Sequence, residues 1–429
     1  MSEKTFVLHP VLKNAADTGR SVQAGLEEIK NLTAAINLTI TAAESVELKK
    51  TNASLFIGKG AAERIAEKIK ENEITLAVVD CALSPIQQRN LEKLWNCKVI
   101  DRTALILEIF GERARTKEGV LQVELAHLSY QRSRLVRGWT HLERQRGGRG
   151  FLGGPGETQI ELDRRVISDN IAKLKKELEE VKRTRHLHRE ARRRVPYPIV
   201  ALVGYTNAGK STLFNRLTNA DVFAKDMLFA TLDPTMRLLK LPSGRRIILS
   251  DTVGFISNLP TELVAAFRAT LEEVAEASLI LHVRDISHPD AAAQKTDVEN
   301  VLKALGLENR VDRGLIEVLN KTDLLNESDY SALSVAAGRN KNQIPVSAVT
   351  GTGIEDLLSV IENSLAAGRS EMTADIPVAN GAALAYLYRV GEVLDRKDGD
   401  QVCHVRVRLD QADIQKFKHS YPQVIYALS

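Results

Sequence analysis

Short, mainly apolar runs recur through the middle of the chain, and each one stops at a glycine or a polar residue. The runs occupy 198–203, 247–250, 315–319 and 344–346, and helix-like patterns separate them. Such runs are typical of parallel strands that are buried on both faces. Residues 196–368 are therefore predicted to form an α/β domain with a mostly parallel sheet and flanking helices.

The two ends of the chain show shorter periodic segments. Residues 1–115 alternate between strand-like and helix-like stretches, which predicts a small α/β domain with a parallel sheet. The expected elements are Thr5–His9, Gln23–Leu32, Leu38–Thr41, Ala61–Lys70, Thr75–Val79, Pro85–Trp95, Lys98–Ile100 and Ala104–Arg113. Residues 369–429 contain the strictly alternating Val402–Leu409 and then a short helix through Lys418, so a small α+β domain is expected there.

Residues 116–195 show apolar positions at alternating four- and three-residue spacing, which predicts two helices that pack along a common seam. The seam positions are Leu121, Leu125, Leu128, Leu135, Trp139 and Leu142, then Ile167, Ile171, Leu174, Leu178 and Val181. A glycine-rich segment at 147–156 separates them, and Thr158 with Glu161 forms a capping box that predicts the start of the second helix. We expect an antiparallel helical hairpin with a glycine-rich tip loop.

Charge is concentrated in this hairpin. Residues 132–194 carry 18 Lys and Arg against 9 Asp and Glu, a net charge of +9, whereas the whole chain carries +4. The tip loop adds Arg146, Arg149 and Phe151, and arginine with an aromatic side chain is a common combination for gripping RNA. A solvated hairpin that joins two domains and a surface for anionic membrane are the alternatives.

Composition and cysteine usage narrow the class of protein. The chain has 429 residues, 44% hydrophobic and 27% charged, as is ordinary for soluble globular proteins. Three cysteines without metal-ligand spacing fit a reducing cytosol. No apolar run approaches the ~18 residues of a membrane span, and the N-terminus lacks a signal-peptide pattern. We expect a cytoplasmic monomer without a stable membrane anchor, with peripheral membrane association as an alternative location.

A phosphate-binding loop follows the first of the central apolar runs. Its residues are Gly204, Tyr205, Thr206, Asn207, Ala208, Gly209, Lys210 and Ser211. A loop between a strand and a helix lets backbone N–H groups and the helix N-terminus face phosphate oxygens. We expect Lys210 to reach the β- and γ-phosphates and Ser211 to ligate Mg²⁺. A glycine-rich turn before an ordinary helix is the alternative.

Two later segments fit the metal and the γ-phosphate. Asp251 ends the second apolar run, where it is placed to hold the metal through water, and Gly254 can present its N–H to the γ-phosphate. The segment Phe229–Thr235 offers Thr231 and Thr235, one of which would lend its hydroxyl to Mg²⁺. Spacing alone leaves that choice open.

The segment Asn320-Lys321-Thr322-Asp323, which follows the third apolar run, predicts which base of the nucleotide the chain binds. The Asp323 carboxylate can accept hydrogen bonds from the N1–H and the 2-amino group of guanine, whereas adenine offers no such pair of donors. The segment Ser347-Ala348-Val349 fits a final loop whose backbone N–H meets the guanine oxygen. The sequence therefore predicts a site for GTP or GDP.

Phe255 stands where many GTPases place a glutamine that orients the attacking water. Phenylalanine has no group for this task, so we expect slow hydrolysis by the isolated chain. Either a partner completes the site, by ordering residues 224–235 or by donating a group, or Phe255 packs against the sheet while another residue or the substrate positions the water.

Together these motifs resemble the HflX family of ribosome-associated GTPases over nearly the whole chain. The segments that carry the resemblance are Gly204–Asn215, Phe229–Thr235, Asp251–Ile256, Leu135–Gln145, Gly154–Gln159 and Phe56–Gly60. The resemblance implies binding to the large (50S) ribosomal subunit and its rRNA through the hairpin loop. It also implies ribosome-stimulated GTP hydrolysis and the splitting, recycling or rescue of ribosomes under stress. A ribosome biogenesis factor and a GTP-dependent switch that recruits a protein partner are the alternatives.

The resemblance also assigns residue roles. It makes Thr231 the magnesium threonine together with Ser211, and it makes Lys210, Thr231 and Gly254 the catalytic set. The nucleotide contacts that it implies are Gly204–Ser211, Phe229, Ala230, Thr231, Leu232, Asp233, Asp251, Thr252, Val253, Gly254, Asn320, Lys321, Thr322, Asp323, Ser347, Ala348 and Val349.

Overall fold

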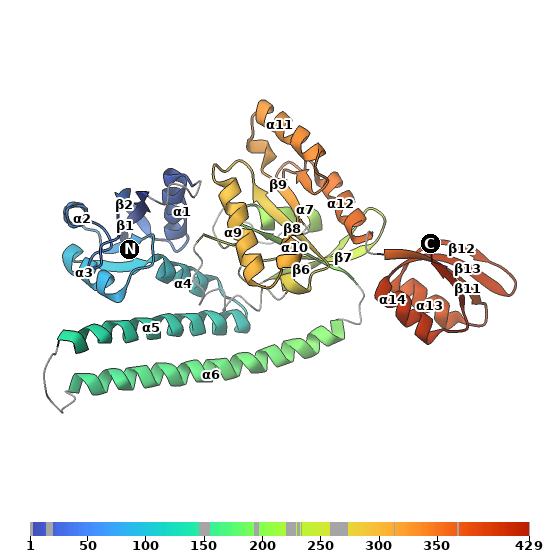
Figure 1. The fold of residues 1–429 in the computed structure, drawn as a ribbon, viewed down its shortest axis with the longest axis horizontal. Helices are drawn as coiled ribbons and strands as arrows, with labels where there is room; N and C mark the ends of the chain where they lie inside the picture. The colour runs from blue at the N-terminus through green and yellow to red at the C-terminus, as the bar shows by residue number, and fades with distance from the viewer. Residues whose placement is uncertain are drawn as a thin grey trace.

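The described part of the computed structural model contains three sheets, which follow one another along the molecule, and one long helical hairpin, which is drawn below the first two (Figure 1). The structure describes residues 3–13, 20–145, 155–192, 197–219, 229, 232, 234–257, 273–312, 314–366 and 369–428. The glycine-rich tip of the hairpin and Ala230, Thr231 and Asp233 lie outside these ranges. Within the described ranges, none of the helices combines the length and the apolar character that crossing a membrane would require.

The N-terminal sheet is entirely parallel and has the strand order β2-β1-β3-β4. Its strands are β1 (Lys4–Leu12), β2 (Thr39–Leu48), β3 (Leu76–Val79) and β4 (Lys98–Asp101), with helices α1 (Val22–Ala34), α2 (Lys59–Glu71), α3 (Pro85–Trp95) and α4 (Arg102–Arg113). Local signals fix several boundaries: Ser84 and Gln87 form a capping box at the start of α3, where Pro85 occupies the first turn. The parallel sheet expected at this end of the chain is confirmed.

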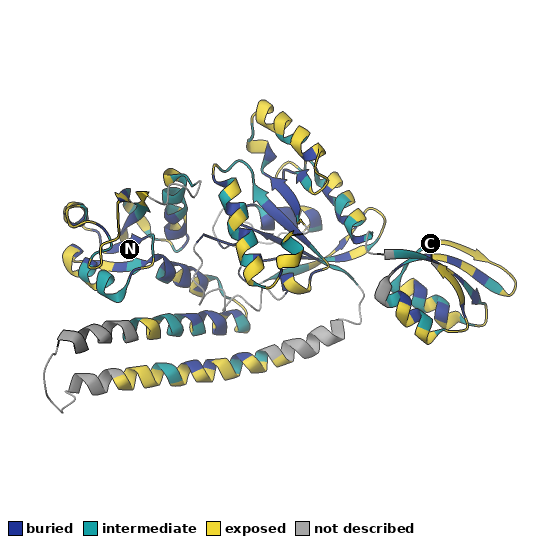
Figure 2. Cartoon of the chain, in the orientation of Figure 1, coloured by how far each residue is buried: buried dark blue, intermediate teal, exposed yellow. Residues whose placement is uncertain are grey.

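The hairpin consists of α5 (Lys117–Gln145) and α6 (Pro155–Arg192), which lie side by side (Figure 1). Part of the predicted seam is present, because Leu121 of α5 is buried with Leu174 and Leu178 of α6, and Leu125, Leu128 and Val181 pack against them. The side chains of Trp139 and Leu142 lie outside the described part of the structure. Figure 2 shows the buried positions in the middle of α6, between exposed and intermediate ones. The predicted capping box is wrong: α6 already begins at Pro155, so Thr158 lies inside the helix. Proline at a first helical position supplies an earlier start.

The central sheet has the order β10-β9-β8-β5-β7-β6 and is parallel except for the edge strand β6. Its strands are β5 (Ile199–Gly204), β6 (Thr235–Lys240), β7 (Arg246–Asp251), β8 (Leu279–Asp285), β9 (Ile316–Asn320) and β10 (Gln343–Pro345). The helices around it are α7 (Lys210–Thr218), α9 (Ala291–Ala304), α10 (Glu308–Asp312), α11 (Glu327–Gly338) and α12 (Ile354–Ala366), with a 3₁₀ helix at Thr322–Leu324. The mostly parallel α/β architecture predicted for this region is confirmed.

The C-terminal sheet is antiparallel, in the order β12-β13-β11-β14. It contains β11 (Arg369–Pro377), β12 (Glu392–Asp398), β13 (Val402–Asp410) and β14 (Ile425–Leu428), with helices α13 (Gly381–Val390) and α14 (Gln411–Ser420). The alternation expected along β13 is present, since Cys403, Val405, Val407 and Leu409 are buried with Leu387 and Phe417 of the helices. We propose the ranges 1–115, 116–195, 196–368 and 369–429 as the domains.

Candidate functional site

The phosphate loop leaves the carboxyl end of β5, which lies between β7 and β8 in the central sheet. Two of its glycines are needed for conformation and for space. Gly209 has φ 87°, and a Cβ there would lie 2.2 Å from Nδ2 of Asn320; a Cβ at Gly204 would lie 2.1 Å from the carbonyl oxygen of Val283. The loop therefore packs directly on the neighbouring strands β8 and β9.

Lys210 begins α7 and is 6% exposed. Its ammonium donates to the backbone carbonyls of Gly204, at 3.0 Å, and Tyr205, at 2.8 Å, and so spans the loop. Burial lowers the pKa of Lys210 to about 8, and the negative charge of Asp251 offsets only part of that effect. The protein thus holds a desolvated cation at the point where the phosphates are predicted.

Ser211 and Asp251 meet beside this lysine. The Ser211 hydroxyl donates to Oδ2 of Asp251 at 2.7 Å, and Asp251 is fully buried at the end of β7. Hydroxyl and carboxylate oxygens are ligands that Mg²⁺ accepts, so this pair fits a magnesium site that nucleotide phosphates would complete. The described residues contain no cluster of three His, Cys, Asp or Glu side chains that could bind a metal by themselves.

The segment after Asp251 is held against the phosphate loop by backbone contacts. The N–H of Thr206 donates to the carbonyl of Phe255 at 2.7 Å, and the N–H of Phe255 donates to the carbonyl of Gly204 at 3.1 Å. A Cβ added at Gly254 would lie 2.9 Å from Cα of Thr206 and 3.0 Å from Nζ of Lys210. Only glycine lets this backbone approach the loop so closely. The structure therefore places Gly254 beside Lys210.

Side chains that follow β9 and β10 hold together the part of the site that is predicted to bind guanine. Asn320 donates to the carbonyl of Ala208 at 2.8 Å and accepts from the N–H of Ala348 at 3.0 Å, and thereby connects the phosphate loop to the 347–349 loop. The Ser347 hydroxyl donates to Oδ1 of Asp323 at 2.6 Å, which orients the exposed carboxylate. Its position at this edge fits the two donors of a guanine ring.

Lys321 has a partner that the sequence did not point out. Its ammonium lies 2.7 Å from Oδ2 of Asp285, the last residue of β8. Asp285 also accepts from the N–H and the hydroxyl of Ser287. A polar residue at the carboxyl end of an apolar strand was the available signal, because ligand sites of open α/β sheets form at that edge.

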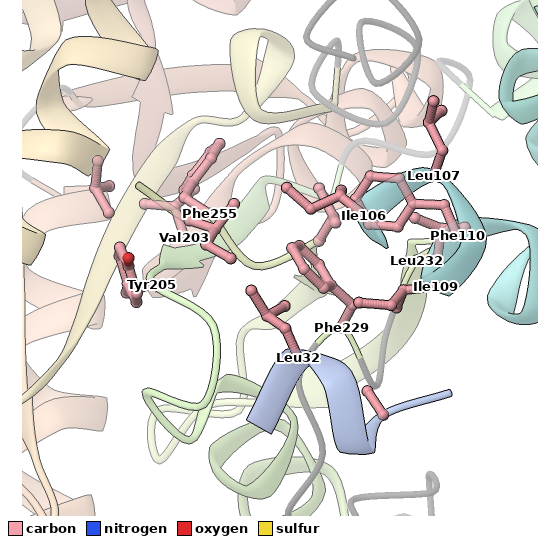
Figure 3. Close-up of a cluster of buried hydrophobic side chains, with 14 of the residues drawn as sticks. Leu32, Ile106, Leu107, Ile109, Phe110, Val203, Tyr205, Phe229, Leu232 and Phe255 are labelled. Atoms are coloured by element: carbon pink, nitrogen blue, oxygen red, sulfur yellow. The ribbon is translucent and has the colours of Figure 1, made fainter. Parts of the chain in front are cut away.

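The N-terminal region packs against the GTPase region beside the phosphate loop, through one hydrophobic cluster that both regions share (Figure 3). Phe229 and Leu232 are buried there, and the ring of Phe229 meets that of Phe110 edge to face at 4.7 Å between centroids. Phe255 is 2% exposed in the same cluster. Its side chain thus packs in the apolar interior, as one of the two alternatives for this residue expects.

A polar network lies next to that cluster. The Tyr205 hydroxyl donates to Oε2 of Glu28 at 2.6 Å and accepts from the N–H of Ser257 at 2.8 Å. Arg102 pairs with Glu28 and with Asp80, and it donates to the Ser257 hydroxyl at 3.0 Å. Burial, followed by the charge of Glu28, raises the pKa of Tyr205. Sequence reasoning missed this network because no local pattern connects residues so distant along the chain.

The remaining predicted residues are distributed as follows. Asn207 has a positive φ of 60° within the loop, and the Thr252 hydroxyl donates to the carbonyl of Leu202 at 2.6 Å. Thr322 and Val253 are buried, whereas Val349 is 65% exposed. Ala230, Thr231 and Asp233 lie outside the described residues, and Thr235 is the first residue of β6.

Comparison with known families divides the chain into four matching segments. Residues 23–111 match the model described as GTP-binding GTPase N-terminal, and 113–192 match the GTP-binding GTPase Middle Region. Residues 199–321 match the model described as 50S ribosome-binding GTPase, and 332–421 match the HflX C-terminal domain.

Curated relatives match this chain in sequence over most of their length. The chain is 50% identical over 395 residues to GTPase HflX of Magnetococcus marinus, which covers 92% of this chain and 90% of that protein. It is 41% identical over 403 residues to GTPase HflX of Escherichia coli, with 93% of both chains covered. With the nucleotide motifs gathered at one edge of the central sheet, these similarities show that the chain belongs to the HflX family of GTP-binding, GTP-hydrolysing enzymes.

Proposed function

We propose that the nucleotide site consists of 204–211, 229–233, 251–254, 320–323 and 347–349, with Lys210, Thr231 and Gly254 as the catalytic set. The observation that carries this assignment lies at one edge of the central sheet. There the Asp323 carboxylate is held by Ser347 of a neighbouring loop, and the Lys210 ammonium is held by the Gly204 carbonyl of its own loop. The carboxylate provides guanine specificity, and the ammonium neutralises phosphate charge.

Residues at the same edge of the central sheet could bind a magnesium ion. Ser211 and Thr231 would ligate the ion, and Asp251 would hold it through water; the 2.7 Å contact between Ser211 and Asp251 supports this role. When bound, Mg²⁺ neutralises charge on the phosphate oxygens. The chain's own contribution is to fix the Ser211 hydroxyl at the start of α7, beside the phosphate loop.

Hydrolysis by the isolated chain is slow in this proposal, and ribosomes accelerate it. Phe255 is buried and has no hydrogen-bonding side chain, so it does not orient the attacking water. A group or a conformational restriction from a partner can contribute roughly 10³- to 10⁵-fold in such enzymes. The partner that we propose is the large ribosomal subunit.

Binding to that subunit is assigned to the basic hairpin and its tip. The net charge of +9 in 132–194 is opposite in sign to the phosphates of rRNA, and the family model that matches residues 199–321 is described as a 50S ribosome-binding GTPase. We propose that the protein acts as a monomer that docks on the large subunit and splits or rescues ribosomes under stress.

The test measures GTP turnover with and without purified large subunits, together with cosedimentation at increasing salt. If several basic residues contact RNA, the log of the affinity falls with log salt at roughly −0.7 to −0.9 per contact. The double charge reversal Arg146→Glu and Arg149→Glu should abolish cosedimentation, whereas reversal of the exposed Arg237 and Arg339 in the GTPase region is the matched control.

Each alternative predicts a different result in these experiments. Splitting is tested by incubating intact ribosomes with the protein and GTP and separating the particles on a gradient. Binding to immature particles alone would favour a biogenesis factor. A shallow salt dependence that survives the charge reversals would favour a switch that recruits a protein partner.

A further inference from the structure

The loop that faces the purine has one peptide group that the protein leaves available. Four of its N–H groups have partners within the chain: those of Ser347, Ala348, Thr350 and Gly351. The N–H of Val349 makes no hydrogen bond to the described part of the chain. The Val349 N–H is therefore the donor of this loop that remains for the 6-oxo group of guanine.

The carbonyl of that same peptide group is held from the other side. Nε of Arg216 donates to the carbonyl oxygen of Ala348 at 3.1 Å, and Nη2 of Arg216 donates to the carbonyl oxygen of Val349. Arg216 lies in the last turn of α7, the helix that begins at the phosphate-binding Lys210. The guanidinium also lies beside Gly351, since a Cβ there would be 4.0 Å from it. One side chain thus contacts most of the loop.

The geometry of a peptide group connects these two observations. The C=O and N–H of a trans peptide point in opposite directions, so an arginine on the Ala348 carbonyl fixes where the Val349 N–H points. A hydrogen bond to the carbonyl also polarises the group and strengthens the N–H as a donor. The planar fork of arginine suits two neighbouring carbonyls better than the single point charge of lysine.

We infer that Arg216 is a positioning residue for purine recognition, which directs the Val349 N–H at the 6-oxo group while Asp323 binds the N1–H and the 2-amino group. This inference rests on the proposed nucleotide site. In this arrangement, different residues position the groups that bind the two edges of the base. Arg216 acts at the 6-position, and Ser347 with Asp323 acts at the 2-position. Arg216 is itself exposed, so its loss leaves no buried charge behind.

The experiment measures the affinities of the full chain for GTP, 6-thio-GTP and ITP by calorimetry in Mg²⁺ buffer. The first analogue weakens the acceptor at the 6-position, and ITP lacks the 2-amino group. Arg216→Met should weaken GTP binding roughly three- to tenfold, the value of one neutral hydrogen bond. The preference for GTP over 6-thio-GTP should fall by the same factor, and the preference for GTP over ITP should be unchanged.

Two further variants separate positioning from general damage. Arg216→Lys should restore part of the 6-position preference, and Arg339→Met, which removes an exposed arginine elsewhere in the same region, should change neither ratio. KM for GTP should rise with kcat unchanged, because the γ-phosphate is distant from the base. Equal losses for all three nucleotides, or unchanged 6-position preference, would overturn the inference. A wild-type chain that does not prefer GTP to ATP would instead overturn the proposed nucleotide site.

Discussion

The two sides of the nucleotide site are built from different parts of the chain. On the base side, Asn320 contacts Ala208 of the phosphate loop and Ala348, and Ser347 contacts Asp323; all of these residues lie within the GTPase region. On the phosphate side, Tyr205 and Ser257 contact Glu28 and Arg102 of the N-terminal region. In the proposed site, we therefore expect base selectivity to depend on the GTPase region alone, whereas the segments beside the phosphates depend on packing between two regions.

The largest effect expected from this comparison is the loss of nucleotide binding in Lys210→Ala, on the phosphate side. Lys210 provides the buried cation of the phosphate loop, and charge-assisted hydrogen bonds to phosphate are each strong. Affinity for GTP and GDP should fall by more than about 100-fold. Calorimetric titration measures it, with the exposed Lys240→Ala as control. Tight GTP binding by Lys210→Ala would remove the lysine from its predicted role.

The next effect is confined to the base side. Asp323→Asn should weaken GTP binding by roughly 10²-fold and shift preference toward xanthosine triphosphate, whose 2-oxo group accepts from the new amide. Competition between the two nucleotides measures the shift. An unchanged GTP affinity would mean that the Asp323 carboxylate does not bind the base.

The base side can be predicted from the sequence better than the phosphate side, because only the phosphate side depends on contacts between two regions. The base side depends on residues that follow apolar strands, such as Asp323 after β9, and strand ends of a parallel sheet converge on one edge. The phosphate side depends on Glu28 and Arg102, which lie 177 and 155 positions from Tyr205 and Ser257. No periodicity or local motif reports such pairs, so neither residue could be placed at the site from the sequence.

The sequence pattern also does not indicate the roles of Pro155 and Arg216. Pro155 looked like part of a glycine-rich loop, yet it begins α6, because proline is well tolerated at a first helical position. Arg216 belongs to none of the motifs identified in the sequence, although it donates to the carbonyl of Ala348. Its partner lies 132 positions away, so the contact depends on the packing of α7 beside the 347–349 loop.

Substitutions should lower the free energy of unfolding most on the phosphate side, where the N-terminal and GTPase regions pack together. Arg102→Met removes the cation between Glu28 and Asp80 and leaves two carboxylates in a buried network. Loss of one partner of a buried ion pair costs roughly 3–5 kcal/mol. Chemical denaturation should show this loss, and the exposed Arg339→Met should show almost none. The preference for GTP over ITP should not change; if it does, the two sides are not independent.

The buried lysine makes stability on the phosphate side depend on pH. The pKa of Lys210 is lowered to about 8 by burial, against an ordinary value of 10.5. Between these two values the unfolded chain binds more protons than the folded one, so the free energy of unfolding rises with pH. Relative to Lys210→Met, the ligand-free protein should gain roughly 3 kcal/mol across that interval. The free energy of unfolding is measured by denaturation at several pH values. If it changed with pH by the same amount in the two proteins, the lowered pKa would be contradicted.

The smallest effect tests whether the region around Thr231 is held by the N-terminal region. Phe110 and Phe229 pack edge to face, and such pairs contribute roughly 0.5–1.5 kcal/mol beyond the area that they bury. A double-mutant cycle with Phe110→Ala, Phe229→Ala and the double variant isolates this interaction in the free energy of unfolding. Each single change should also cost the roughly 3–5 kcal/mol of a large buried ring, so the two losses should add to more than the double variant shows. Strict additivity would mean that the two rings do not interact in solution and that contact between the two regions does not extend to Phe229.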